Sequence, residues 1–208
     1  PACLPPGVKL AFLPSLTGVR LRLDASGPNR GEAERLIAAV ESVIRERGGR
    51  FVYGQEDDEL EAVVGSLLRS SHRTLACAES CTGGTLAKKI SSVPGSSAYF
   101  LGSVVAYADR VKTGLLGVDP AAIGAHGAVS REVALAMASG VRSVTEAEIG
   151  IAVTGIAGPG GGSPEKPVGT VWIAYADGDG AVALKQSFGE GRERVVERAT
   201  AAALDLLR

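Results

Sequence analysis

Histidine is scarce in this chain of 208 residues, which contains only His72 and His126. A zinc site of the two-histidine type would need both of them together with cysteine ligands. A Ser-His-Asp triad would need one histidine and a reactive serine, but the sequence has no Gly-x-Ser-x-Gly elbow to supply that serine. His126 precedes Gly127, as is typical of a helix C-terminus. We therefore expect no bound metal, no cofactor and no histidine-based triad.

Cysteine and long apolar runs are also rare. Three cysteines, Cys3, Cys77 and Cys81, form no disulfide framework and indicate a reducing compartment. No run approaches the roughly 18 to 20 apolar residues of a membrane span, and the chain does not open with a basic segment followed by an apolar one. With 45% hydrophobic residues to build a core, the sequence predicts a globular cytoplasmic protein without membrane contact.

Charge is divided unevenly along the chain. Residues 1–54 carry a net charge of +3, and residues 55–208 carry a net charge of −4. This asymmetry indicates two units. A net charge of +3 is too small to argue for a nucleic-acid partner.

Residues 1–54 have the pattern of a small α+β module. Residues 8–13 and 19–23 predict two strands, the second with strict alternation of apolar and polar residues. Apolar residues then recur at helical spacing before Gly48 and Gly49 end the run. Residues 50–53 predict a third strand, so the expected order is β-β-α-β.

Residues 55–208 alternate between helical and strand patterns, as expected for an α/β domain. Strands are predicted at residues 74–78, 148–154, 169–177 and 181–188, and a last helix at residues 192–207. The stretch 94–112 places two serines after a Pro-Gly turn, then a strand-like segment, then Lys112.

Two loops of small residues follow predicted strands. Residues 79–84 lead from a strand into a helix, an arrangement that can direct free backbone N–H groups at an anion. The alternative is a tight turn capped by Ser80 or Thr82. Residues 155–169 contain six glycines and three prolines, which favours a loop that contacts a ligand closely. The alternative for this second loop is a flexible surface excursion.

Lysine is the remaining candidate for a base that could activate a serine. Lys112 stands among Val111, Leu115 and Leu116, and burial there would favour its neutral amine. Asp109, three residues earlier, could instead form a surface ion pair with Lys112. The residue pattern leaves both alternatives open.

Several long motifs, in order, closely resemble the nicotinamide-nucleotide amidase domain of the competence/damage-inducible protein A (CinA) family. They are residues 78–84, 94–97, 127–130, 154–162 and 165–170. The resemblance covers about residues 55–208, and residues 1–54 resemble the KH-like module that precedes this domain. It implies a three-layer α/β/α domain with a mixed sheet and the hydrolysis of nicotinamide mononucleotide to nicotinate mononucleotide and ammonia. Full-length members begin with a further domain, so we expect this chain to be part of a longer protein.

The resemblance also implies roles for individual residues. Ser97 would be the nucleophile, Lys112 the general base and Tyr107 an assisting hydroxyl. Substrate binding or oxyanion stabilisation would fall to Glu79, Ser80, Cys81, Thr82, Gly83, Gly84, Thr154 and Gly155. Arg192, at the start of the last predicted helix, would bind the nucleotide phosphate.

This chain departs from the family pattern at Val196, where an arginine is usual. An alternative function is therefore a catalytically inactive module for nucleotide binding or assembly. The expected partners are nicotinamide mononucleotide and a second copy of the chain. RNA binding is disfavoured because the KH-like module lacks a Gly-x-x-Gly loop between helices.

Overall fold

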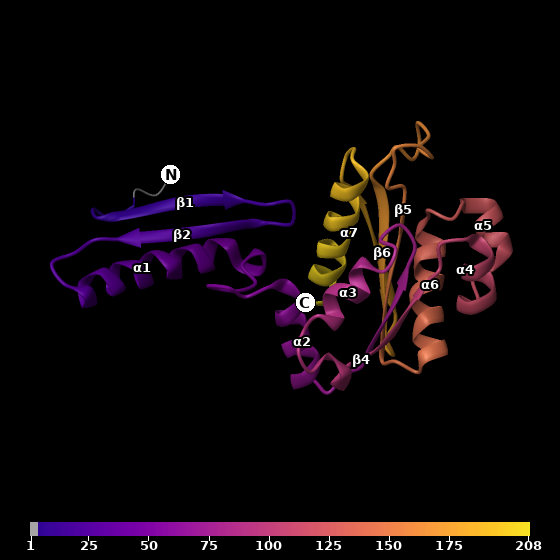
Figure 1. The fold of residues 1–208 in the computed structure, drawn as a ribbon, viewed down its shortest axis with the longest axis horizontal. Helices are drawn as coiled ribbons and strands as arrows, with labels where there is room; N and C mark the ends of the chain where they lie inside the picture. The colour runs from indigo at the N-terminus through magenta and orange to yellow at the C-terminus, as the bar shows by residue number, and fades with distance from the viewer. Residues whose placement is uncertain (1–3) are drawn as a thin grey trace. The chain divides into compact units, whose positions relative to one another are not determined.

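The computed structural model describes residues 4–208, and its chain divides into two compact units, Pro1–Gln55 and Glu56–Arg208 (Figure 1). Cys3 lies outside the described residues. Across the described part of the chain, no helix has the length and apolar character needed to cross a membrane.

The first unit consists of a two-stranded sheet and one long helix. Strands β1 (Val8–Pro14) and β2 (Val19–Ala25) pair antiparallel. Helix α1 (Arg30–Gly48) begins where the Asn29 side chain accepts a hydrogen bond from the Glu32 amide at 3.0 Å. Such N-terminal caps satisfy a backbone donor that has no partner within the helix. The two strands and the helix agree with the expectation from sequence.

The third strand expected at residues 50–53 is not formed. Residues Gly49–Phe51 instead make a short 3-10 helix, η1. Gly49 has a φ of +48°, and the Val52 amide donates to the Gly49 carbonyl at 3.2 Å. This local turn uses a backbone donor that a strand would need for pairing, so the prediction of a third strand is wrong.

The second unit is built on a five-stranded mixed sheet with the order β4-β3-β5-β6-β7. Its strands are β3 (Leu75–Glu79), β4 (Phe100–Val105), β5 (Ile149–Gly155), β6 (Thr170–Ala176) and β7 (Ala181–Ser187). Strands β3, β4 and β5 run parallel, and β6 and β7 add antiparallel. We call the edge at which β3, β4 and β5 end the carboxyl edge, and the opposite one the amino edge.

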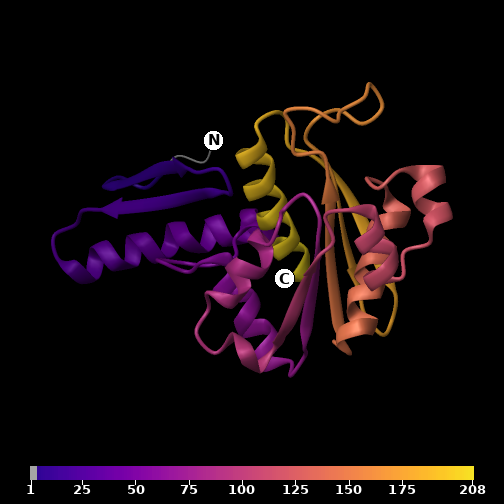
Figure 2. The same cartoon turned by 45° about the vertical axis from the view of Figure 1, so that its right-hand side comes forward.

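Helices cover both faces of this sheet (Figures 1 and 2). One face carries α2 (Leu60–Ser70), α3 (Thr85–Ser91) and α7 (Arg192–Leu207). The other carries α4 (Asp109–Leu116), α5 (Pro120–His126) and α6 (Arg131–Thr145). A further 3-10 helix, η2 (Ser96–Ala98), precedes β4. The predicted three-layer α/β/α arrangement with a mixed sheet is therefore confirmed.

The face of the sheet that packs against α6 is lined by small residues. Alanines of three neighbouring strands lie there, namely Ala76, Ala78, Ala152 and Ala174. Gly140 continues this close packing on α6, because a Cβ atom there would lie 1.9 Å from the Leu116 carbonyl oxygen. The absence of side-chain volume lets α6 approach both the sheet and the end of α4.

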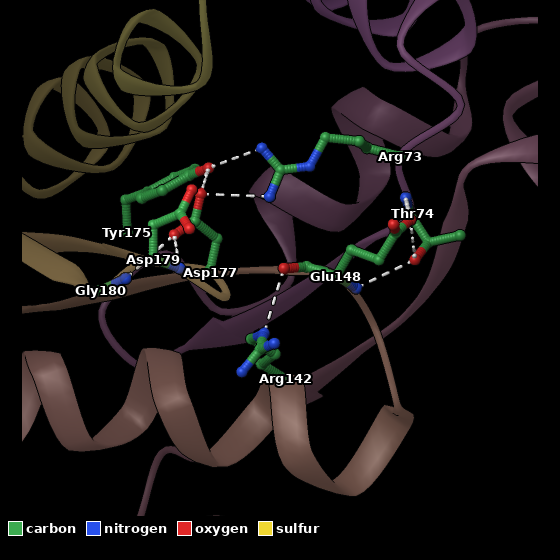
Figure 3. Close-up of polar contacts among 8 residues, drawn as sticks. All are labelled: Arg73, Thr74, Arg142, Glu148, Tyr175, Asp177, Asp179 and Gly180. Carbon is green, nitrogen blue, oxygen red and sulfur yellow. Dashed lines mark hydrogen bonds and ion pairs between the residues drawn. The ribbon is translucent and has the colours of Figure 1, made fainter.

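Polar side chains fasten the amino edge (Figure 3). The Asp177 carboxylate accepts hydrogen bonds from the Tyr175 hydroxyl at 2.7 Å and from Arg73 at 3.1 Å. The Glu148 carboxylate accepts from the Thr74 amide at 2.8 Å. These contacts join the start of β3 to the start of β5 and to the end of β6, so they stabilise the sheet far from the carboxyl edge.

Glycine at position 140 should be essential to this packing. Gly140→Ala should destabilise the second unit by about 3 kcal/mol, because the added methyl group meets a backbone carbonyl that cannot move aside. Gly114→Ala on α4 is the matched control, since a Cβ there meets nothing within 4 Å. The control should be neutral or stabilising by up to about 1 kcal/mol. Denaturant titration measures both, and equal effects would refute the packing argument.

Asp177 should make stability depend on pH. Hydrogen bonds lower the pKa of Asp177 to about 2 from its ordinary 3.8. The largest effect is that of the Tyr175 hydroxyl, followed by the Asp179 amide and the Arg73 guanidinium. A depressed carboxyl pKa gives stability that is present above the unfolded pKa and lost as pH falls through the folded one. Asp177→Asn should therefore be less stable than wild type at neutral pH, with the difference shrinking between about pH 4 and pH 2. A difference in unfolding free energy that is the same at pH 7 and pH 2 would contradict this.

Candidate active site

Most of the expected site residues gather at the carboxyl edge of the sheet. Ser80 directly follows β3, Tyr107 follows β4, and Thr154 and Gly155 end β5. Arg192 begins α7, which follows the end of β7 at the same edge. Parallel strands place their carboxyl ends together, and this is where open α/β sheets bind ligands.

The Lys112 side chain is buried at this edge, only 1% exposed. Its Nζ atom donates to the Tyr107 carbonyl at 3.1 Å and to the Asp109 carboxylate at 3.3 Å. The ion pair anticipated with Asp109 is present, but the amine is not at the surface as that alternative assumed. Lys112 therefore presents a buried amine to the segment that follows β4.

Ser97 does not lie with Lys112. It is exposed in η2, before β4 begins, whereas Lys112 lies beyond the end of β4. The six residues of β4 separate the two by roughly 20 Å at about 3.3 Å per residue. A lysine side chain cannot span that distance, so the expected Ser97–Lys112 pair is not formed within one chain. This corrects the assignment of Ser97 as the serine that Lys112 activates.

Glu79 has a different role from the substrate contact expected for it. Its fully buried carboxylate accepts hydrogen bonds from the amides of Gly84, Leu86 and Ala87 at 2.9, 3.1 and 2.9 Å. The Ser103 hydroxyl on β4 donates a fourth, at 3.1 Å. These amides open α3, so the protein's own carboxylate satisfies the donors that were expected to bind a ligand anion.

The loop that follows Glu79 keeps two other amides available. The Ser80 amide donates to the Val153 carbonyl at 2.9 Å, and the Gly83 amide donates to the Ser80 carbonyl at 3.2 Å. Among the described residues, the amides of Cys81 and Thr82 make no backbone hydrogen bond. The Thr82 hydroxyl is buried there without a partner. The backbone directly after Ser80 therefore carries two amides without a carbonyl partner in residues 4–208, of which that of Cys81 lies against its own thiol.

Gly83 and Gly84 allow this loop to turn into α3. Their φ angles are +59° and +101°, in the region that residues with a side chain rarely adopt. Thr154, in contrast, uses its hydroxyl to hold a neighbouring segment, donating to the Ala128 carbonyl at 2.9 Å. Gly155 packs tightly, since a Cβ atom there would lie 3.0 Å from the Cys81 sulfur. These four residues shape the site through the backbone and through packing.

Cys81 is not a nucleophile at this site. Burial raises the pKa of its thiol to about 12, against the weaker opposing effects of a hydrogen bond from its own backbone amide and of the Arg192 and Lys112 charges. Burial likewise raises the pKa of Cys77. Both thiols stay protonated at neutral pH, and the thiolate is the reactive form. Within residues 4–208, no three His, Cys, Asp or Glu side chains come together in a way that could hold a metal ion.

Arg192 connects three segments at the rim of the site. Its guanidinium donates to the Tyr107 hydroxyl and to the Gly158 carbonyl, both at 2.7 Å. Tyr107 is 58% exposed, so this contact lies at the mouth. Val196, one turn later, packs against the core beneath α7. The position of the usual second arginine is therefore partly buried.

The glycine-rich loop is fastened rather than loose. Its base is closed by the Ile156 amide donating to the Thr170 carbonyl at 2.9 Å and the Gly169 amide donating to the Ile156 carbonyl at 2.8 Å. The Lys166 ammonium donates to the carbonyl of His126, the last residue of α5. Sequence reasoning missed Lys166; its position inside a glycine-rich loop was the only signal.

Removal of the Glu79 carboxylate should unfold the loop beside Ser80. Glu79→Ala leaves three amides, one buried and two partly buried, without an acceptor and should cost about 3 kcal/mol of unfolding free energy, at about 1 kcal/mol for each donor. Glu79→Gln keeps one carbonyl oxygen and should lie between alanine and wild type. Asp205→Ala, which breaks an exposed ion pair with Arg208, is the control and should cost less than about 1 kcal/mol. A Glu79→Ala variant as stable as this control would contradict the role given to Glu79.

Two family descriptions match the chain. Residues 57–208 match "CinA C-terminal domain", and residues 5–54 match "Damage-inducible protein CinA KH domain". A CinA-like protein of Salinibacter ruber is 50% identical over 198 residues, which are 95% of this chain and 48% of that protein. A CinA-like protein of Cytophaga hutchinsonii is 45% identical over 207 residues, 100% of this chain and 50% of that protein. The chain thus spans about half the length of these curated relatives.

Solved structures of similar proteins cover about three quarters of the chain. The competence/damage-inducible protein CihA of Agrobacterium tumefaciens is 34% identical, with a TM-score of 0.68 over 74% of this chain and 97% of that one. A CinA superfamily protein of Escherichia coli is 31% identical, with a TM-score of 0.70 over 77% and 96%. The family matches cover nearly the whole chain and agree with the fold, and the chain therefore belongs to the CinA family, with a CinA KH domain followed by a CinA C-terminal domain.

Proposed function

We propose that this chain hydrolyses the carboxamide of nicotinamide mononucleotide to nicotinate mononucleotide and ammonia, with Ser80 as nucleophile and Lys112 as base. The observation that carries this proposal is the buried Lys112 amine at the carboxyl edge, whose charge acts on the thiol of Cys81, the residue after Ser80. The substrate class rests on the resemblance of the site motifs to nicotinamide-nucleotide amidase domains.

The first half of the reaction forms an acyl-enzyme. Lys112, as a free amine, takes the Ser80 hydroxyl proton while the serine oxygen attacks the amide carbon. The amides of Cys81 and Thr82 donate to the oxyanion, because they lie directly after the nucleophile and are not used in backbone hydrogen bonds among the described residues. The Lys112 ammonium then returns its proton to the leaving nitrogen, which departs as ammonia. The adjacent pyridinium ring withdraws electrons and assists the attack.

Water completes the cycle. It attacks the acyl carbon, Lys112 takes one of its protons, and the breaking ester bond returns the oxygen to Ser80, which recovers the proton. Tyr107 supports Lys112 through its carbonyl, and its hydroxyl lies against Arg192 at the mouth. Arg192 is placed to bind the nucleotide phosphate, because a guanidinium pairs with two phosphate oxygens at once.

A second candidate function is nucleotide binding without turnover. The observation that favours it is the ion pair between Lys112 and Asp109, which engages the amine that the serine hydroxyl would need as its base. Val196 in place of the usual arginine points the same way. Binding of nicotinamide mononucleotide without any release of ammonia would select this alternative.

Ammonia release from nicotinamide mononucleotide should separate the two candidate serines. Ser80→Ala and Lys112→Met should each lower kcat/KM by at least about 100-fold, the usual loss when a nucleophile or base is removed. Ser97→Ala should retain wild-type turnover, because Ser97 lies at the amino edge. Thermal unfolding of each variant checks that the fold persists. Loss of activity in Ser97→Ala with full activity in Ser80→Ala would return the nucleophile to Ser97.

A further inference from the structure

Two cations at the rim of the site have no acidic partner among the described residues. Arg192 donates to a carbonyl and to a tyrosine hydroxyl, and Lys166 donates to the His126 carbonyl. Glu165, next to Lys166, accepts instead from the Ser163 hydroxyl at 2.8 Å. Lys89 and Lys112, in contrast, have carboxylate partners, Glu61 at 2.9 Å and Asp109 at 3.3 Å. Within residues 4–208, the two cations at the rim therefore make their hydrogen bonds to neutral groups only.

The two cations are fastened to opposite faces of the sheet. Arg192 belongs to α7 on one face, and Lys166 reaches the end of α5 on the other. The glycine-rich loop leaves β5 and returns into β6 between these two helices, beyond the carboxyl edge (Figures 1 and 2). Arg192 contacts this loop at Gly158, and Lys166 belongs to the same loop, so one segment is bound both to α7 and to the end of α5.

We infer that Lys166 is a second phosphate-binding cation, which forms a clamp with Arg192 on the phosphate of a nucleotide ligand. This inference rests on the proposed function, which supplies the nucleotide as ligand. A phosphate monoester carries close to two negative charges at neutral pH and forms stronger hydrogen bonds with cations than a neutral carbonyl does. Lys166 exchanges the His126 carbonyl for a phosphate oxygen, as Arg192 exchanges the Gly158 carbonyl.

The clamp accounts for a nucleotide site in which Val196 stands where a second arginine is usual. Val196 packs against the core, so this position adds no charge one turn after Arg192. Lys166 supplies the second charge from the loop, where glycine residues let the backbone come close to a ligand. Recognition of the phosphate therefore depends on a residue far from Arg192 in sequence, and the nucleotide is favoured over the nucleoside.

Binding measured in the Ser80→Ala background tests this clamp without relying on turnover. The ligands are nicotinamide mononucleotide and nicotinamide riboside, which differ only in the phosphate, titrated by calorimetry. Lys166→Met keeps the length of the side chain but removes its charge. It should weaken nucleotide binding by about 10- to 100-fold, the usual value of a hydrogen bond to a charged group, and leave riboside binding unchanged. Lys166→Arg should restore most of the nucleotide affinity, and Lys88→Met, on the exposed face of α3, is the matched control.

The outcomes separate this inference from the proposed function. If the Ser80→Ala protein binds the nucleotide and Lys166→Met binds it equally well, the clamp is refuted while the amidase proposal stands. If Lys166→Met weakens nucleotide and riboside binding alike, the lysine supports the loop rather than the phosphate, and the clamp is again refuted. If no variant binds the nucleotide, both proposals fail. Selective weakening for the nucleotide establishes the clamp, whether or not wild-type protein releases ammonia.

Discussion

The buried carboxylate of Glu79 is the acceptor on which the arrangement of the site depends. By satisfying the amides that open α3, it fixes the loop between β3 and that helix. It also decides where a ligand can place negative charge. Donors at the start of α3 are occupied, so in the proposed reaction the oxyanion would be left with the amides of Cys81 and Thr82. The phosphate of the proposed substrate would bind to cations at the outer rim.

Strand direction then determines which side chains can act together. Ser80, Tyr107 and Lys112 follow strands that end at the same edge, and Arg192 reaches that edge because β7 runs antiparallel to β6. The close approach of α6 to an alanine-lined sheet keeps this scaffold rigid. Polar contacts around Asp177 stabilise the amino edge, which leaves the carboxyl edge free for loops that contact a ligand.

Much of the fold could be predicted from sequence, because apolar runs and alternation report which residues are buried. The prediction of a third strand in the first unit was wrong, because a turn at Gly48 and Gly49 overrode the β propensity of residues 50–53. The separation of Ser97 from Lys112 was in principle predictable, because a residue before a strand and one after it lie at opposite ends. The role of Glu79 also had a signal, an acidic residue that ends a fully apolar strand. For Lys166 the only signal was its position inside a glycine-rich loop, since its contact with His126 arises only from folding.

The exposed position of Ser97 has a practical consequence. Ser97 lies in a short helical turn at the amino edge, roughly 20 Å from Lys112. A chemical modification of this position would therefore not contact the carboxyl edge. Both described cysteines, Cys77 and Cys81, are buried, so a thiol introduced at position 97 would be the accessible one among the described residues. The molecule thereby offers an attachment point for a fluorophore or a solid support that leaves the mouth of the site facing solution.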